Sequence, residues 1–293
     1  MELKFHQTAL SCLGTTVDQT QNQEQTQELR IPDGMPDIGK VLGAWGQIVI
    51  RSKEWRSGGM SVSGGIMAWI LYMSEENATV HCLDTWIPFQ MKWDVHKPSV
   101  DGIMQISATL CSIDARLISA RKLMLRANVS VRGEAFLDDS AIIYTPTQLP
   151  EDVQLLKQTY PVTTPREAGE KAFVIEDDLM LPPSCPKFDQ LVRYELRPEM
   201  IDQKVMAGKA VFRGVAVLHI LYIADDGNLA TWDFELPFSQ FTELNKDYEP
   251  DAAAKFTLAV TSLELEKTEN GFHLKAGLTG QYVIYDRFLI EVV

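Results

Sequence analysis

An internal repeat with a spacing of 150 residues constrains the fold of this chain more than any other feature. The apolar run Ile-Leu-Tyr at 70–72 leads into an acidic turn at 75–76, and the same phrase returns at 220–222 and 225–226. Further matches keep the same order along the chain, which predicts a duplication. They are residues 29–36 with 179–186, Gly64 with Gly214, Pro88-Phe89 with Pro237-Phe238, and residues 125–127 with 274–276.

The duplication predicts two tandem domains, at residues 1–145 and 146–293. The length of 293 residues suits about two domains, each large enough for its own core. Residues 16–28, TVDQTQNQEQTQE, are polar and low in complexity, and we expect them to form exposed strand or coil. Gly64 and Gly214 are expected to mark a bulge or a close approach of two backbones.

The local patterns inside each copy predict an all-β fold. Residues 60–73 and 210–223 are rich in Val, Ile, Ala and aromatic residues. Both faces of the second run are apolar, as expected of a central strand that lies between layers. We expect each copy to be β-sandwich-like or a partly open barrel, with few short helical turns, one of them at 35–42. Further strands are expected at 48–51, 103–110, 123–131, 229–236, 256–265 and 272–285.

Charge and sequence pattern argue against several classes of partner and compartment. The net charge of −13 argues against nucleic acid and against an anionic membrane surface. No apolar run is long enough for a membrane-spanning segment, and the N-terminal residues lack the pattern of a secretory signal. The cysteines at 12, 82, 111 and 185 have neither metal-ligand nor redox spacing, so we expect a reducing cytoplasm.

The sequence also lacks the usual signatures of catalysis. The five histidines include no pair at metal-binding spacing, and the acidic doublets fall at expected turns. The glycine pairs at 58–59 and 64–65 do not form a phosphate-binding loop, and no serine or cysteine lies in a nucleophile motif. We therefore expect no enzymatic activity, no metal and no cofactor.

Tryptophan is distributed unevenly, with five residues in the first copy and one, Trp232, in the second. We expect Trp69 to be in the core. Trp55, Trp86 and Trp93 leave two interpretations open, since partly exposed tryptophans either pack or form a recognition surface. A flat apolar surface would favour a protein partner, and a groove with polar rims would favour a saccharide.

One ordered set of motifs in the first copy points to a known family. It consists of Ile-Pro-Asp at 31–33, Pro-Asp-Ile at 36–38, Gly64, Ile-Leu-Tyr at 70–72, Ile-Pro-Phe at 87–89 and Ala-Arg-Lys at 120–122. This set resembles the SPOCS domain, the spore-coat and SipL module of endospore-forming Firmicutes. The second copy keeps Gly214, Ile-Leu-Tyr and Pro-Phe, but it loses the acids of the opening motif and the Arg-Lys pair.

The resemblance implies a non-enzymatic scaffold that acts in spore-coat assembly, in the mother-cell cytoplasm at the forespore surface. It implies partners among other spore-coat or basement-layer proteins, and a chain truncated before further repeat sequence and a LysM domain. The alternative is a module that binds cell-wall glycan through exposed tryptophans of the first copy. Unpaired strand edges add a hypothesis of self-association. The candidate interaction surface comprises Pro32, Asp33, Pro36, Asp37, Trp55, Trp86, Trp93, Arg121 and Lys122.

Overall fold

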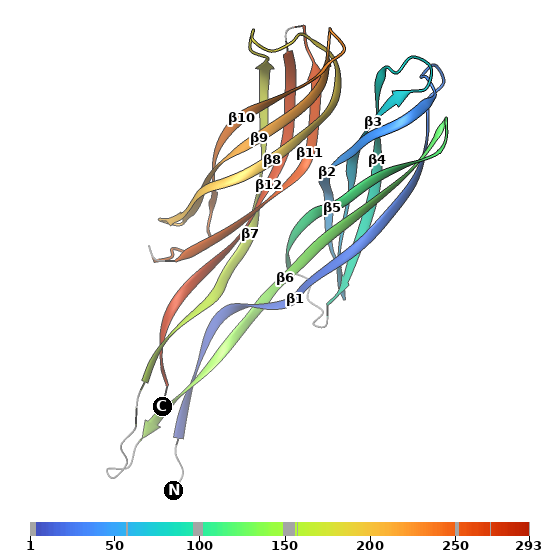
Figure 1. Ribbon diagram of the computed structural model, residues 1–293. Coiled ribbons are helices and arrows are strands. Elements are labelled where there is room, and N and C mark those ends of the chain that lie inside the picture. Colours follow the sequence, from blue (N-terminus) through green and yellow to red (C-terminus); the bar gives the residue numbers. More distant parts are fainter. Residues whose placement is uncertain are drawn as a thin grey trace.

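All regular secondary structure in the described part of the chain is β-strand, which confirms the all-β prediction (Figure 1). The computed structural model describes residues 4–56, 58–95, 102–148, 156, 158–249, 252–269 and 271–292. The first repeat contains β1 (Lys4–Arg30), β2 (Ile38–Arg56), β3 (Gly59–Ser74), β4 (Val80–Asp94), β5 (Ile103–Ser119) and β6 (Lys122–Gln148). The second contains β7 (Gln158–Met180), β8 (Phe188–Met206), β9 (Lys209–Ala224), β10 (Leu229–Glu243), β11 (Ala253–Lys267) and β12 (Gly271–Val292).

The two repeats have the same topology. Each contains two three-stranded antiparallel sheets, β2-β3-β4 and β1-β6-β5 in repeat one, β8-β9-β10 and β7-β12-β11 in repeat two. β2 lies beside β5 and β8 beside β11, so the two sheets of each repeat face one another as an open sandwich. The apolar runs that carry Ile-Leu-Tyr are the central strands β3 and β9, as predicted.

Each sandwich has its own apolar core. Alternate residues of β3 and β6 point inward in repeat one, and those of β9 and β12 point inward in repeat two. The tyrosines of the repeated motif, Tyr72 and Tyr222, are fully buried. The period-2 pattern therefore positions the repeated motif inside the molecule, not on its surface.

The helical turn predicted at 35–42 is wrong. Residues 33–34 form a turn and β2 begins at Ile38, where it pairs with Ser74 of β3. Pairing with a central strand gives hydrogen-bond partners to backbone N–H and carbonyl groups that a single helical turn would leave without partners. Residues 16–28, expected as exposed strand or coil, are part of strand β1, in which Val17 is buried and residues 20–28 alternate between exposed and half-buried.

Gly64 and Gly214 mark both a bulge and a close approach. β2 has a register shift between Ile50 and Ser52, opposite Gly64, and β8 has the corresponding shift opposite Gly214. A Cβ atom at Gly64 would overlap the carbonyl oxygen of Val49 and the ring of Phe89. At Gly214 it would overlap the equivalent carbonyl and the ring of Phe238. The Gly and Pro-Phe motifs are thus one packing unit.

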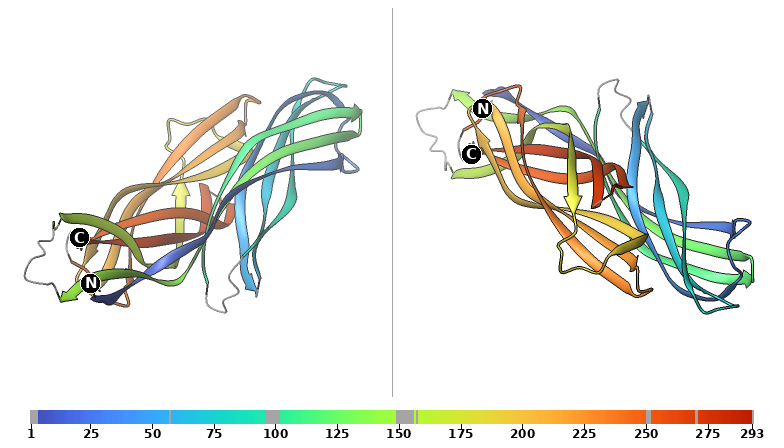
Figure 2. Two further views of the ribbon diagram at one scale, coloured as in Figure 1. Left: turned by 90° about the horizontal axis from the view of Figure 1, so that it is seen from below. Right: turned by 90° about the horizontal axis from the view of Figure 1, so that it is seen from above.

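The repeats lie side by side, with both chain ends at the same end of the molecule (Figures 1 and 2). The sandwiches are extended there by two ribbons, β1 with β6 and β7 with β12, which run past the shorter strands. We call these extensions, residues 4–14, 137–148, 158–166 and 286–292, the stalk. The predicted domain boundary at 145/146 falls inside β6, in the stalk.

Candidate interaction site

Arg121 holds the opening motif of repeat one in place. Its guanidinium donates to the carboxylate of Asp37 at 2.6 Å and to the carbonyl oxygens of Pro32 at 3.0 Å and Met35 at 3.2 Å. These are charge-assisted bonds, the stronger class of hydrogen bond. Lys122, the next residue, pairs with Glu28 at 2.9 Å. The structure therefore brings six of the nine predicted surface residues to one end of repeat one: Pro32, Asp33, Pro36, Asp37, Arg121 and Lys122.

Repeat two has an equivalent loop, but its sequence has no arginine at the position of Arg121. Residues 31–37 and 181–187 have the same turn, and the buried tyrosine hydroxyl donates to a proline carbonyl in both loops. The distances are 3.2 Å from Tyr72 to Pro36 and 3.0 Å from Tyr222 to Pro186. By sequence, the residue that corresponds to Arg121 is Asn270, which is outside the described residues. The tyrosine is thus the shared anchor, and the arginine belongs to repeat one.

Replacing Arg121 by alanine is expected to lower the free energy of unfolding by about 1–2 kcal/mol, because several carbonyl oxygens and a carboxylate lose their donor. Denaturant unfolding measures the loss, and limited proteolysis between residues 31 and 37 reports local loosening. Arg116→Ala is the matched control, since its exposed pair with Asp114 should contribute less than ~0.5 kcal/mol. Equal losses in both variants would show that Arg121 is an ordinary surface arginine.

The three tryptophans of the predicted surface lie in three different places. Trp93 is 2% exposed and belongs to the core of repeat one, which differs from the expectation of partial exposure. Trp55 is half-buried against the same core, and its ring lies where a Cβ on Gly102 would be. Trp86 carries the guanidinium of Arg51 over its ring at 4.0 Å. These rings therefore already have packing partners.

The outer face of the β2-β3-β4 sheet packs against repeat two. Trp69 meets Tyr194 of β8 with ring centroids 5.1 Å apart, and the guanidinium of Arg193 lies 4.8 Å from the ring centroid of Trp45. Leu71 forms a buried cluster with residues of β8 and β9. We call Trp45, Met67, Trp69, Leu71 and Trp86 the aromatic face. Its position at the junction between the repeats accounts for three of the five tryptophans of repeat one.

Buried glutamines join the backbones of the two repeats. Gln281 of β12 is 1% exposed. Its amide accepts from the Ile106 N–H at 2.8 Å and donates to the Ile106 carbonyl oxygen at 2.7 Å. Gln105 returns the contact by donating to the Tyr282 carbonyl oxygen at 2.7 Å. This arrangement imitates the pairing of two strands, so it fixes one register between the repeats.

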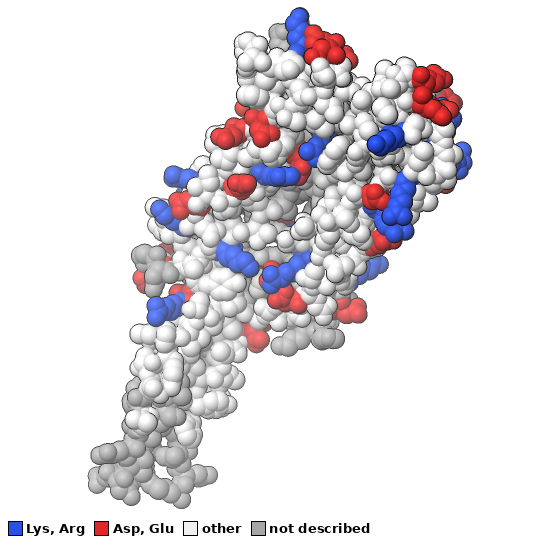
Figure 3. Space-filling view, in the orientation of Figure 1, with Lys and Arg blue, Asp and Glu red and all other residues white. Residues whose placement is uncertain are grey.

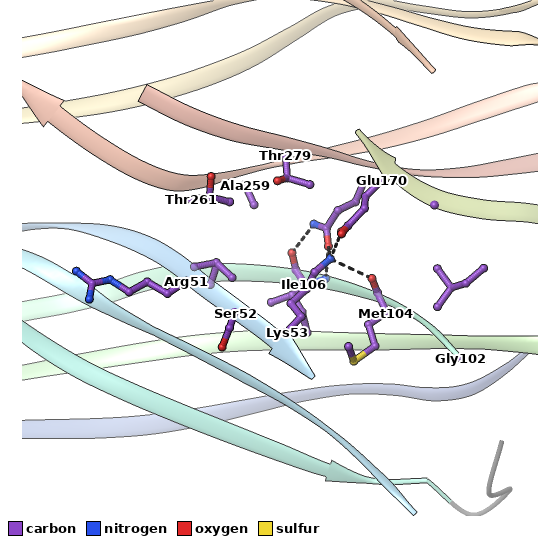
Figure 4. Close-up of a pocket in the computed structure, with 14 residues that line it drawn as sticks. Arg51, Ser52, Lys53, Gly102, Met104, Ile106, Glu170, Ala259, Thr261 and Thr279 are labelled. Atoms are coloured by element: carbon purple, nitrogen blue, oxygen red, sulfur yellow. Dashed lines mark hydrogen bonds and ion pairs between the residues drawn. The ribbon is translucent and has the colours of Figure 1, made fainter. Parts of the chain in front are cut away.

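Lys53 closes the same junction (Figure 4). Its ammonium group lies between the Met104 carbonyl oxygen at 3.3 Å, the Gln281 side-chain oxygen at 3.1 Å and the Glu170 carboxylate. The surrounding hollow has a volume of about 490 Å³, and two further hollows of about 510 and 430 Å³ lie along the junction. In the first hollow, the lysine and glutamate neutralise each other.

Cys82 donates to the Val192 carbonyl oxygen at 2.9 Å across the junction. Burial, with a smaller contribution from the Asp84 carboxylate, raises the pKa of the Cys82 thiol to about 12. Since the thiolate is the reactive form, Cys82 should react with a disulfide reagent at pH 8 at least ~100-fold more slowly than exposed Cys111. Single-cysteine variants measured by absorbance provide the test, and similar rates would mean that the junction opens readily.

Two classes of site do not occur among the residues that the structure describes. No three histidine, cysteine, aspartate or glutamate side chains are grouped so that they can hold a metal ion. No helix with the length and apolarity to cross a membrane is present in the same residues.

Comparison with known families gives one match, in the second repeat. Residues 188–268 match the family model for SipL, SPOCS domain. The match confirms the SPOCS resemblance for repeat two, and it runs from the first residue of β8 to just past the end of β11. It thus covers the SPOCS strands that carry Gly214, Ile-Leu-Tyr and Pro-Phe. No curated protein and no solved structure matches the chain.

The SPOCS match indicates a sporulation-related role and a spore-associated protein. Repeat one has the same strand order and the same placement of Gly64, Ile-Leu-Tyr and Pro-Phe. In both repeats the tyrosine and the phenylalanine of these motifs are buried and the glycine lies opposite a bulge, whereas Pro88 and Pro237 are exposed. The buried motif residues therefore build the core of the domain.

The sequence analysis missed the aromatic face and the glutamine contacts. A signal for the face was present in the repeat alignment, since Trp45 and Trp86 correspond by register to Glu195 and Glu235. A position that is apolar in one copy and charged in the other indicates that only one copy is covered. Gln281 had no such signal, because a buried glutamine is identified by its partners and not by its neighbours in sequence.

Proposed function

We propose that this chain is a non-enzymatic interaction scaffold in spore-envelope assembly, which binds other coat morphogenetic proteins at the forespore surface. The SPOCS match in repeat two is the observation that carries the proposal. The junction supports it, because buried glutamines and the aromatic face hold the repeats as one body. A rigid body presents its surfaces at fixed positions and loses little conformational entropy when it binds.

The best candidate surface is the end of repeat one around residues 31–37. Asp33 is exposed, and its carboxylate lies 4.0 Å from the guanidinium of Arg121. Lys122 adds a second, half-buried cation nearby. Charges on a loop that hydrogen bonds hold in place contribute more to the orientation and specificity of partner binding than to its affinity. Repeat two has Pro183 and Lys187 at the positions of Asp33 and Asp37, so its equivalent loop presents a different charge pattern.

A pull-down from sporulating-cell lysate tests the proposal. The baits are the wild-type chain, boiled wild-type chain, Asp33→Lys, and Asp225→Lys as a control with the same charge change at a turn of repeat two. We expect coat or basement-layer proteins on wild type and on Asp225→Lys, and less on Asp33→Lys. Equal recovery on the boiled chain would contradict the proposal.

Saccharide binding is the second candidate, because the 510 Å³ hollow contains Trp69 and Trp86 beside polar Asp84 and Thr85. Stacking on a sugar needs a free aromatic face. Arg51 lies over Trp86 and Tyr194 lies against Trp69, which weighs against this use. Retention of the wild-type chain on peptidoglycan, without recovery of any coat protein, would favour this candidate over the scaffold.

A further inference from the structure

The stalk contains a strand edge that no other strand covers in the part of the chain that the structure describes. β6 pairs with β1 along its whole length, whereas β5 leaves β6 at Phe136. Residues 137–148 therefore hydrogen bond on one side, and within the described residues no strand pairs with their other side. A two-stranded ribbon is marginally stable by itself, and an unpaired edge is a template for another strand.

One face of the same ribbon is apolar and exposed. Phe5, Ile142 and Tyr144 are 52%, 54% and 54% exposed. The register places Ile142 opposite Ala9 and Tyr144 opposite Gln7, so the three exposed side chains lie on one face. The stretch 140–144, Ser-Ala-Ile-Ile-Tyr, combines high β-propensity with no charge and no proline. That combination is typical of segments that pair with copies of themselves.

The charge distribution favours a second copy of this chain as the partner. Each chain has a net charge of −13, so two copies repel each other where their acidic surfaces approach. Residues 5–10 and 140–148 contain no Asp, Glu, Lys or Arg. The lower end of the molecule in Figure 3 accordingly shows no charged side chains among its described residues. Residues 5–10 and 140–148, the latter beginning just after Asp138 and Asp139, are thus a part of the stalk on which two copies can meet without charge repulsion.

The packing inside the chain supports the same partner. The two stalk ribbons come from equivalent strands, and β1 already lies against β7. Leu13 and Phe136 form a buried cluster with Ala168 and Val283 at the base of the stalk. The β1–β6 ribbon continues outward beyond this cluster (Figure 1), and its register places Phe5 and Ile142 on the same face as Leu13.

We propose that two copies of this chain associate through residues 140–144 of their β6 strands, edge to edge in a two-fold arrangement. This goes beyond the scaffold role and does not depend on it, because it concerns contact between identical chains. A two-fold contact brings the same residue into the interface twice, so one substitution acts on both sides.

The test is sedimentation equilibrium on the purified chain over a concentration series. Wild type should show a monomer–dimer equilibrium. Ile142→Asp should weaken it roughly 100-fold, because two carboxylates enter an apolar contact without a partner. Ile201→Asp is the matched control, since Ile201 is 70% exposed on β8, outside the stalk, and receives the same charge. Circular dichroism and the unfolding midpoint check that both variants fold.

Three outcomes would overturn the proposal. The first is a wild-type chain that stays monomeric at its highest soluble concentration. The second is a dimer that Ile142→Asp leaves intact, and the third is a dimer that both variants weaken equally. If the chain stays monomeric and binds phosphatidylcholine vesicles in a way that Ile142→Asp abolishes, the partner of this face is a lipid surface and not a second copy.

Discussion

Alanine at Gly64 or at Gly214 is expected to destabilise the protein by at least ~3 kcal/mol, with losses of similar size at the two positions. The added methyl group would overlap a carbonyl oxygen of the bulged neighbouring strand and the ring of the Pro-Phe phenylalanine. A backbone oxygen in a paired strand has little room to move. The strand must therefore separate or the aromatic ring must leave the core, and both changes expose apolar surface.

Denaturant unfolding measures this loss, and Gly59→Ala on the same β3 strand is the milder comparison. Its Cβ would have one close neighbour, the Trp93 carbonyl oxygen at 3.1 Å, and the expected cost is about 1 kcal/mol or less. A small effect at Gly64 and a large one at Gly214 would mean that the repeats do not share this packing unit.

Removal of the Gln281 side chain should have the second-largest effect. Gln281→Ala leaves the N–H and the carbonyl oxygen of Ile106 buried without a partner, and it removes one acceptor from Lys53. Each unsatisfied buried group costs about 1–3 kcal/mol, so we expect a loss of roughly 3 kcal/mol. Because the bonds cross the junction, the unfolding transition should also broaden as the repeats begin to unfold separately.

Gln19→Ala is the control, since Gln19 is an exposed glutamine of β1, and it should change stability by less than ~0.5 kcal/mol. If Gln281→Ala lowered stability but left a single sharp transition, the glutamine would stabilise repeat two without coupling it to repeat one.

The repeat made most of the fold predictable. The 150-residue spacing predicted two equivalent β units, and the apolar alternation around Tyr72 and Tyr222 identified the central strands. Gly64 and Gly214 were predictable as a bulge or close approach, because a strand interior otherwise disfavours glycine. The helical turn at 35–42 failed since pairing of Ile38 with β3 overrides local propensity.

The candidate site was less predictable because its residues depend on contacts between distant segments. The grouping of residues 31–37 with Arg121 came from a family resemblance, and the structure adds the hydrogen bonds that hold the loop. Trp86 and Trp93 look alike in sequence, yet one lies at the junction and the other in the core. Which face of a sheet is covered depends on how the repeats pack, and that information is not local.

The central claim is that the aromatic face and the glutamine contacts hold the two repeats as one body, and small-angle X-ray scattering from the wild-type chain tests it most directly. The account predicts a scattering curve that the single arrangement in Figure 1 reproduces, with Gln281→Ala shifted towards a larger and broader particle. A wild-type curve that requires two independently moving repeats would contradict it, and the tryptophans of the aromatic face would then be free to form a binding surface.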